Sequence, residues 1–169
     1  MYFLNVLEQP NVAATISMLI MLGFVAAFYL SYKNWKQNPS IFIISAAFFV
    51  NFFIANNALY EFLVESKPDN DFYIRWVQYD SITVIATILA HYICKVKHHR
   101  LTSILMYLIF INIAMYLAVH IDIIENGNRE PWWLWTLYTP IINFVEIAIA
   151  LIIIIYSKRS LTIKNGLMV

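Results

Sequence analysis

The sequence predicts an all-α protein in which five helices form a bundle that spans a membrane. Hydrophobic residues make up 62% of the 169 residues and charged residues only 12%, whereas soluble domains carry about 25% charged residues. The apolar residues gather in five segments, each near the roughly 20 residues that a helix needs to cross a bilayer. The net charge is +1, so the chain offers no basic surface of the kind that binds nucleic acid.

Residues typical of helix boundaries separate the five segments. Pro10 opens the first segment and Pro39 the second, because proline fits the first turn of a helix. The polar run 68–71 precedes the third, Gly127 follows the fourth, and Pro131 opens the fifth. The helices are therefore expected at residues 11–32, 40–63, 72–94, 101–124 and 132–156, within a single membrane domain that covers 1–169.

The charged residues predict how the helices are oriented. Eight of the eleven basic residues follow the first, third or fifth segment: Lys33, Lys36, Lys95, Lys97, Arg100, Lys158, Arg159 and Lys164. Most acidic residues lie in the alternate connections. Because basic loops stay in the cytoplasm, we expect a multi-pass protein of the cell membrane whose N-terminus lies outside and whose C-terminus lies inside.

Polar residues run along the third expected helix, where a lipid environment makes them costly and therefore functional candidates. Several are spaced by three or four residues, which places them on one helix face. They either form a proton or ion path from Asp80 to His91, or play structural roles. In the structural interpretation the threonines bond their own backbone and His91 lies at the lipid headgroups. The candidates are Arg75, Trp76, Gln78, Asp80, Thr83, Thr87 and His91.

Two other helices carry polar groups at positions that suggest function. Glu146 lies near the middle of the fifth helix, one turn after Asn143. A carboxylate at that depth should face the bundle interior, where Asp80 is one of several expected partners. In the second helix, Asn57 and Glu61 lie one turn apart and share a face. These groups either act in function or clamp helices together.

The stretch from Arg75 to Thr83, RWVQYDSIT, resembles the third helix of microbial rhodopsins, especially heliorhodopsins. The resemblance implies that Gln78 occupies the counterion position near retinal. The chain departs from that family in having five expected spans and no lysine at membrane depth, so no retinal Schiff base is expected.

The stretch NNALYEF at 56–62, followed by Trp76 and Asp80, is similar to patterns of integral-membrane terpene cyclases. In that family buried carboxylic acids protonate an epoxide or an alkene. The resemblance implies that Glu61 is an acid catalyst, although Tyr60 replaces the tryptophan of the family pattern.

Three classes of function remain open from the sequence. The first, which we favour, is movement of protons, ions or small solutes through the bundle, with Asp80 and Glu146 as the titrating groups. The second is an intramembrane acid-catalysed enzyme acting on a lipid or isoprenoid, in which Asp80, Glu146 or Glu61 donates the proton. The third is a non-catalytic membrane subunit. The expected partners are the lipid bilayer, a hydrophobic or ionic substrate, and further copies or another membrane subunit. No metal or cofactor is expected.

Overall fold

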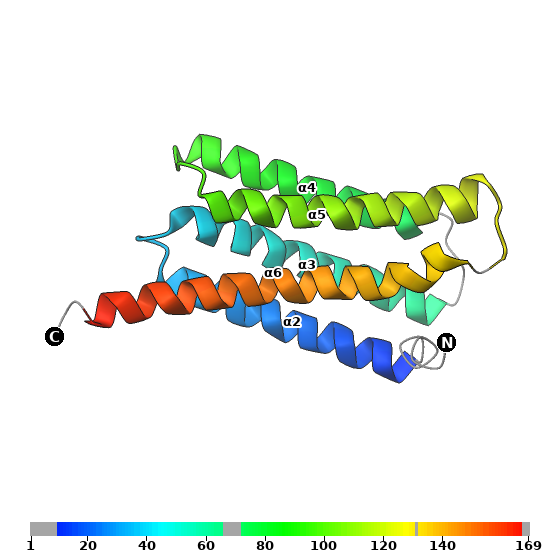
Figure 1. Ribbon diagram of the computed structural model, residues 1–169, viewed down its shortest axis with the longest axis horizontal. Coiled ribbons are helices and arrows are strands. Elements are labelled where there is room, and N and C mark those ends of the chain that lie inside the picture. The colour runs from blue at the N-terminus through cyan, green and yellow to red at the C-terminus, as the bar shows by residue number, and fades with distance from the viewer. Residues whose placement is uncertain (1–9, 66–71, 131, 167–169) are drawn as a thin grey trace.

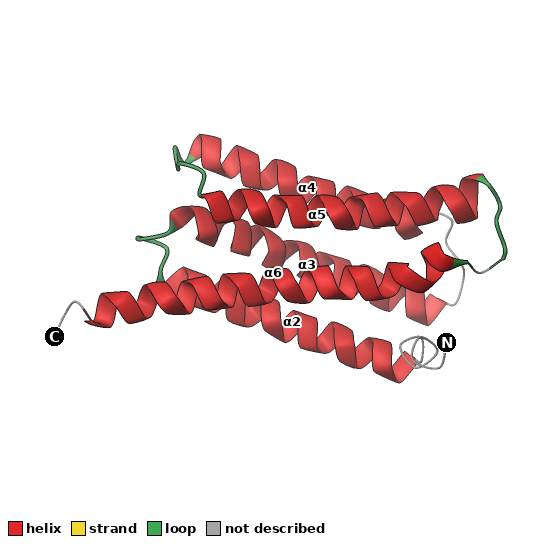
Figure 2. Cartoon of the chain, in the orientation of Figure 1, coloured by secondary structure: helices red, strands yellow, loops and turns green. Residues whose placement is uncertain are grey.

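The fold is a bundle of long α-helices. The computed structural model describes residues 10–65, 72–130 and 132–166, and Figure 2 shows that their regular structure is entirely helical. The predicted all-α class and its five helices are confirmed for this part of the chain. In order, the elements are α2 (Pro10–Lys33), α3 (Pro39–Glu65), α4 (Phe72–Ile93), α5 (Arg100–His120), the short π-helix η1 (Ile121–Glu125) and α6 (Trp133–Gly166).

The helices lie side by side along the long axis of the molecule, and successive helices run in opposite directions (Figure 1). Each helix packs against the next one in the chain, and α6 also packs against α2, so the bundle closes into a ring. The α2–α3 and α4–α5 connections lie at one end, together with the last turns of α6. We call this the basic end, because it carries Lys33, Lys36, Lys95, Lys97, Arg100, Lys158 and Arg159.

The interior of the ring is mostly aliphatic. Fully buried side chains include Ile44 of α3, Leu105 of α5 and Ile153 of α6. Gly23 of α2 lets this helix approach α6 closely. A Cβ atom built at Gly23 would lie 3.3 Å from the Cβ of Ala150. Small residues are used in this way to bring membrane helices close together.

The outer surface of the bundle is also apolar. Large side chains such as Leu19, Tyr107 and Phe144 are at least 63% exposed, which is unusual for a protein surrounded by water. Three helical segments of the described chain, Thr15–Lys33, Arg100–Glu125 and Trp133–Thr162, are long and apolar enough to cross a membrane. Within α3, Pro39–Ile54 is a shorter apolar stretch. Length and composition therefore support a membrane location.

The fourth helix runs close to its expected end, as α5 to His120 and then as the π-helix η1 to Glu125. The expected end of the fifth helix was wrong. The fifth helix continues well past Tyr156 to Gly166, because the α2–α3 connection binds this part of it. Asn34 Nδ2 donates to the backbone oxygen of Ser157, at 2.6 Å, and Asn38 Nδ2 donates to Ser160 Oγ, at 2.8 Å.

Candidate functional site

A small cavity of about 20 Å³ lies at the centre of the ring. We call it the central cavity. Every one of the five helices contributes to its wall, and polar groups come from α3, α4, α5 and α6. The lining residues are Phe24, Phe48, Asn51, Phe52, Asp80, Ile109, Asn112, Glu146 and Ile149.

Asp80 is the most deeply buried acidic residue in the described chain, with 7% of its surface exposed. Asn51 Nδ2 donates a hydrogen bond to its Oδ1, at 3.0 Å. Its Oδ2 is buried and has no hydrogen-bond partner among the described residues, and the same is true of Asn112 Oδ1. A buried acceptor without a partner costs about 1–3 kcal/mol, so a partner for these two oxygens would stabilise the cavity.

Glu146 lines both the central cavity and a larger space beside it. Its carboxylate and that of Asp80 are close enough to repel each other when both are charged. No lysine, arginine or histidine is among the described residues that line either space. The sequence offered several partners for Glu146, and the structure places it in one cavity with Asn51, Asp80 and Asn112.

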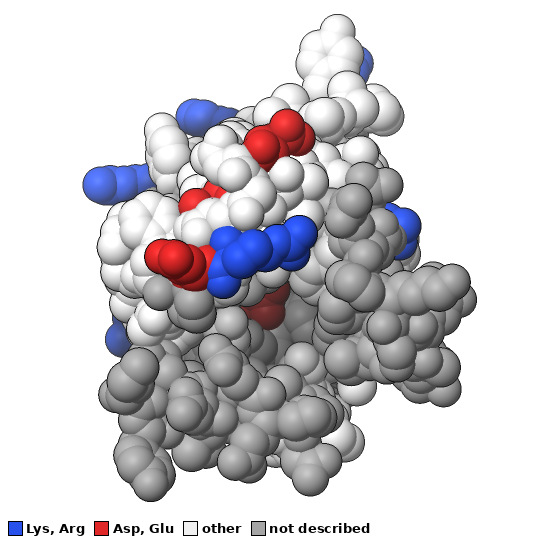
Figure 3. Space-filling model, turned by 90° about the vertical axis from the view of Figure 1, so that its right-hand side faces the viewer, with Lys and Arg blue, Asp and Glu red and all other residues white. Residues whose placement is uncertain are grey.

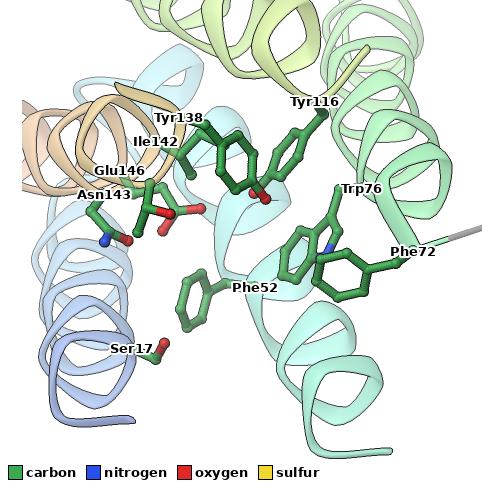
Figure 4. A pocket seen from close by; sticks show the side chains of 10 residues that line it. Ser17, Phe52, Phe72, Trp76, Tyr116, Tyr138, Ile142, Asn143 and Glu146 are labelled. Carbon is green, nitrogen blue, oxygen red and sulfur yellow. The ribbon is translucent and has the colours of Figure 1, made fainter. Parts of the chain in front are cut away.

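The larger space, which we call the vestibule, has a volume of about 140 Å³. Figure 4 shows its aromatic wall, with Glu146 and Asn143 on one side. The Trp76 and Tyr116 rings stack with their centroids 5.6 Å apart, and Tyr138 meets Tyr116 edge-on at 5.8 Å. The vestibule is lined by Ser17, Phe52, Phe72, Trp76, Tyr116, Tyr138, Thr139, Ile142, Asn143 and Glu146.

The vestibule lies toward the end of the bundle opposite the basic end. Its residues come from the first half of α2, the middle of α3, the first turns of α4, the last turns of α5 and the first half of α6. Figure 3 views this end and shows acidic atoms at the base of a hollow. The vestibule therefore lies between Glu146 and this end of the bundle.

A stripe of buried polar groups leads from Asp80 along α4 toward the basic end. Thr83, Thr87 and His91 are each no more than 3% exposed, and the spacing in the sequence had placed them on one face. Thr83 Oγ1 donates to the backbone oxygen of Tyr79, at 3.0 Å, as the structural interpretation expected. Thr87 Oγ1 is buried without a partner among the described residues.

His91 ends this stripe in a hydrogen-bonded cluster. Its Nδ1 lies 2.7 Å from the backbone oxygen of Thr87, and its Nε2 lies 2.8 Å from Ser40 Oγ. Ser40 Oγ also lies 2.7 Å from Thr102 Oγ1 and accepts from the backbone N–H of His99. The His91 side chain is 2% exposed, so it faces the interior at this end of the bundle. Its level in a membrane stays a prediction.

The exposed side of this cluster meets the surface at the basic end. The rings of His91 and His98 stack with centroids 4.0 Å apart, and His98 is exposed. A surface hollow beside them is lined by His91, Tyr92, Ile93, Lys95, Val96 and Lys97. His91 thus connects the buried stripe with this end, as Glu146 does at the other.

Several candidates lie away from these spaces. Arg75 and Gln78, which the helical spacing places off the stripe, are exposed on the outside of α4. They line neither the vestibule nor the central cavity. The side chains of Asn57 and Glu61 lie outside the described residues. Ser40 and Thr102 were missed, although a serine after the helix-opening Pro39 is a recognisable signal.

A separate polar cluster lies at the α5–α6 connection. Trp132 Nε1 and Trp135 Nε1 both donate to Asp122 Oδ2, at 2.8 and 2.7 Å, and Asn128 Nδ2 donates to the same carboxylate. Indole N–H groups only donate hydrogen bonds, and the Asp122 carboxylate accepts both of them. This cluster positions the start of α6 and therefore the vestibule residues that follow it.

Comparisons with known protein families, with characterised proteins and with solved structures found no match to this chain. Among the side chains that the structure describes, no three His, Cys, Asp or Glu residues lie together in a way that would hold a metal ion. The site must therefore be interpreted from its own geometry.

Proposed function

We propose that this protein moves protons across a membrane through the interior of its helix bundle. The observation that carries the proposal is the position of Glu146, which lines both the vestibule and the central cavity that holds Asp80. Ionisable groups inside membrane bundles are typical of proton relays. Here two carboxylates lie side by side without a basic partner in the described walls.

The proposed path has four stages. A proton enters from the vestibule, passes from Glu146 to Asp80, follows the α4 stripe, and leaves through His91 at the basic end. Side chains one helical turn apart are about 5.4 Å apart along the axis, which exceeds hydrogen-bond length. The path therefore includes water between the side chains. The central cavity, at about 20 Å³, is large enough for one water molecule.

The proposal places all five helices across the membrane, with the basic end in the cytoplasm. Basic residues concentrate at one end of the bundle, as the positive-inside rule requires of the cytoplasmic side. The polar side chains of α4 do not oppose this placement, because Asp80, Thr83, Thr87 and His91 face the interior while apolar side chains such as Ile82 and Ile85 face outward.

The orientation can be tested through Cys94, which is exposed and is the single cysteine of the sequence. In intact cells a membrane-impermeant maleimide should leave Cys94 unlabelled, and labelling should appear once the membrane is permeabilised. The matched variant carries Cys94→Ser with Asn126→Cys, because Asn126 is exposed at the opposite end. It should be labelled in intact cells, and the reverse pattern would invert the proposed orientation.

Proton movement can be tested in liposomes that contain the purified protein and a pH-sensitive dye. A potassium gradient with valinomycin should drive proton flux through the wild-type protein, and Glu146→Gln should reduce it to the leak of empty liposomes. Glu130→Gln is the control, because Glu130 is exposed at the α5–α6 connection, and it should keep wild-type flux. A folded Glu146→Gln variant with full flux would rule out the proposed path.

A second candidate function is acid catalysis on an isoprenoid or another lipid, and the vestibule favours it by its composition. Aromatic faces stabilise cations, and Glu146 lies beside several of them. The volume decides against it, since about 140 Å³ is well below the roughly 300–1,000 Å³ of ordinary ligand pockets. Mass spectrometry of lipids extracted from the purified protein would reveal a stoichiometric isoprenoid if this candidate were correct.

A further inference from the structure

The central cavity collects oxygen atoms that have no partner. Asp80 Oδ2 and Asn112 Oδ1 are buried without hydrogen bonds among the described residues, and Asp80 and Asn112 are 7% and 4% exposed. Both side chains line the same cavity as the Glu146 carboxylate. The three oxygen-bearing groups come from α4, α5 and α6, so they surround the space.

The described walls supply little that would satisfy these oxygens. The amide of Asn51 already donates to Asp80 Oδ1, and apart from Asn112 and Glu146 themselves the remaining lining residues are apolar. The other ionisable groups that face the pair are the phenols of Tyr116 from α5 and Tyr138 from α6, both in the vestibule wall. α2 and α3 contribute no ionisable side chain to the cavity. Buried charges in proteins are paired or coordinate metal ions.

A single water molecule would satisfy this set poorly. Water has two hydrogens to donate, whereas the cavity presents an unpartnered carboxylate oxygen, an unpartnered amide oxygen and a second carboxylate. A cation attracts all of these oxygens at once, and it also offsets the repulsion between the two carboxylates. The cavity volume of about 20 Å³ admits one such ion without its water shell.

The ligand set selects the class of ion. Oxygen ligands suit hard cations, whereas zinc and copper sites use histidine or cysteine. Calcium takes 6–8 oxygen ligands, more than these three side chains supply, and magnesium keeps several of its waters, which a space of about 20 Å³ does not hold. The ion that fits is small, hard and monovalent.

We propose that the central cavity binds one Na⁺ ion, held by Asp80, Asn112 and Glu146, in competition with a proton on the carboxylate pair. The inference rests on the proposed function. If protons reach the carboxylate pair through the vestibule, the pair would exchange Na⁺ for protons. Binding itself is measured without transport, so the two proposals can fail separately.

The test is thermal unfolding of the purified full chain in detergent, in NaCl, LiCl, KCl or N-methylglucamine chloride at equal ionic strength. Na⁺ and Li⁺ should raise the melting temperature in a saturable way, because an ion that binds only the folded state stabilises it, whereas K⁺ should match N-methylglucamine. The half-saturating Na⁺ concentration should rise about tenfold per pH unit of acidification where one proton competes with one ion.

The matched variants exchange an amide for an apolar side chain of similar size. Asn112→Leu removes the amide oxygen from the cavity and should abolish the response to Na⁺. Asn143→Leu makes the same exchange in the vestibule and should retain it. If Asn112→Leu does not fold, direct binding of radioactive Na⁺ to the wild-type protein decides the question.

The outcomes are distinct. Identical melting curves in Na⁺ and K⁺ at every pH, or an Asn112→Leu variant with a full Na⁺ response, would overturn the sodium site. A wild-type protein that responds to Na⁺ but moves no protons in liposomes would retain the site and remove the proposed transport. Proton flux without any Na⁺ response would retain transport and remove the site.

Discussion

Replacing Asp80 with asparagine should reduce proton flux about a hundredfold, which is the lower end of what a positioned proton-transfer group contributes. The substitution keeps the shape of the side chain. Its amide oxygen can still accept the hydrogen bond that Asn51 now donates to Asp80 Oδ1, so the packing around α3 and α4 should persist. What disappears is the carboxylate, the group that holds and releases the proton beside the central cavity.

The measurement is dye-reported flux in liposomes, with the melting temperature of the same preparation as the check on folding. Asp80→Asn should unfold close to the wild-type temperature while its flux is lost. A variant that unfolds much earlier would indicate that the carboxylate is structural. A stable variant with wild-type flux would contradict the role given to Asp80.

The double variant Asp80→Asn with Glu146→Gln extends this prediction. Groups that act as one unit lose function together, so removing both costs little more than removing one. We therefore expect the double variant to conduct no less than the weaker of the single variants. If Asp80 and Glu146 lay on separate routes, each single variant would keep the flux of the other route, and only the double variant would fall to the leak of empty liposomes.

The third expected helix shows how far spacing alone can lead. Residues three or four apart share a helix face, so the stripe of Asp80, Thr83, Thr87 and His91 could be read from the sequence, and all four are buried. Arg75 and Gln78 have angles off this face, and their exposure follows from the same geometry. The spacing of polar residues along one helix was therefore sufficient to predict which of its side chains face the interior and which face outward.

Contacts between helices could be identified only from the structure. Asn51, Ser40 and Thr102 look like ordinary polar residues in apolar helices, and the sequence does not specify which partner each one meets. The bundle brings the start of α3, the end of α4 and the start of α5 together, and this places Ser40 Oγ within 2.8 Å of both His91 Nε2 and Thr102 Oγ1. Ring closure between α2 and α6 likewise depends on packing.

Burial near a helix end could not be inferred from position along the helix. His91 lies near the end of α4, yet its side chain is 2% exposed. The α4–α5 connection folds back over it, with the His98 ring stacked on the His91 ring at 4.0 Å. A connection of a few residues can bury a side chain at the end of a helix in this way. The hydropathy of the sequence does not predict such burial.

Thr87→Val should separate a functional stripe from a structural one. Thr87 is completely buried, and its hydroxyl has no partner among the described residues. Valine has nearly the same shape, so the change removes an unsatisfied group that costs about 1–3 kcal/mol. The free energy of unfolding should therefore stay the same or rise. If the hydroxyl is a step between Asp80 and His91, proton flux should nevertheless fall by at least about tenfold.

Ser45→Ala is the matched control for this variant. Ser45 belongs to α3 and not to the α4 stripe, and its buried hydroxyl also has no partner among the described residues. It should show equal or higher stability and unchanged flux. Since a structural role predicts that both variants behave alike, a difference in flux without a loss of stability assigns Thr87 to the path. Equal flux in Thr87→Val and the wild type would remove the α4 stripe from the mechanism and leave the His91 hydrogen bonds as a device for joining α3, α4 and α5.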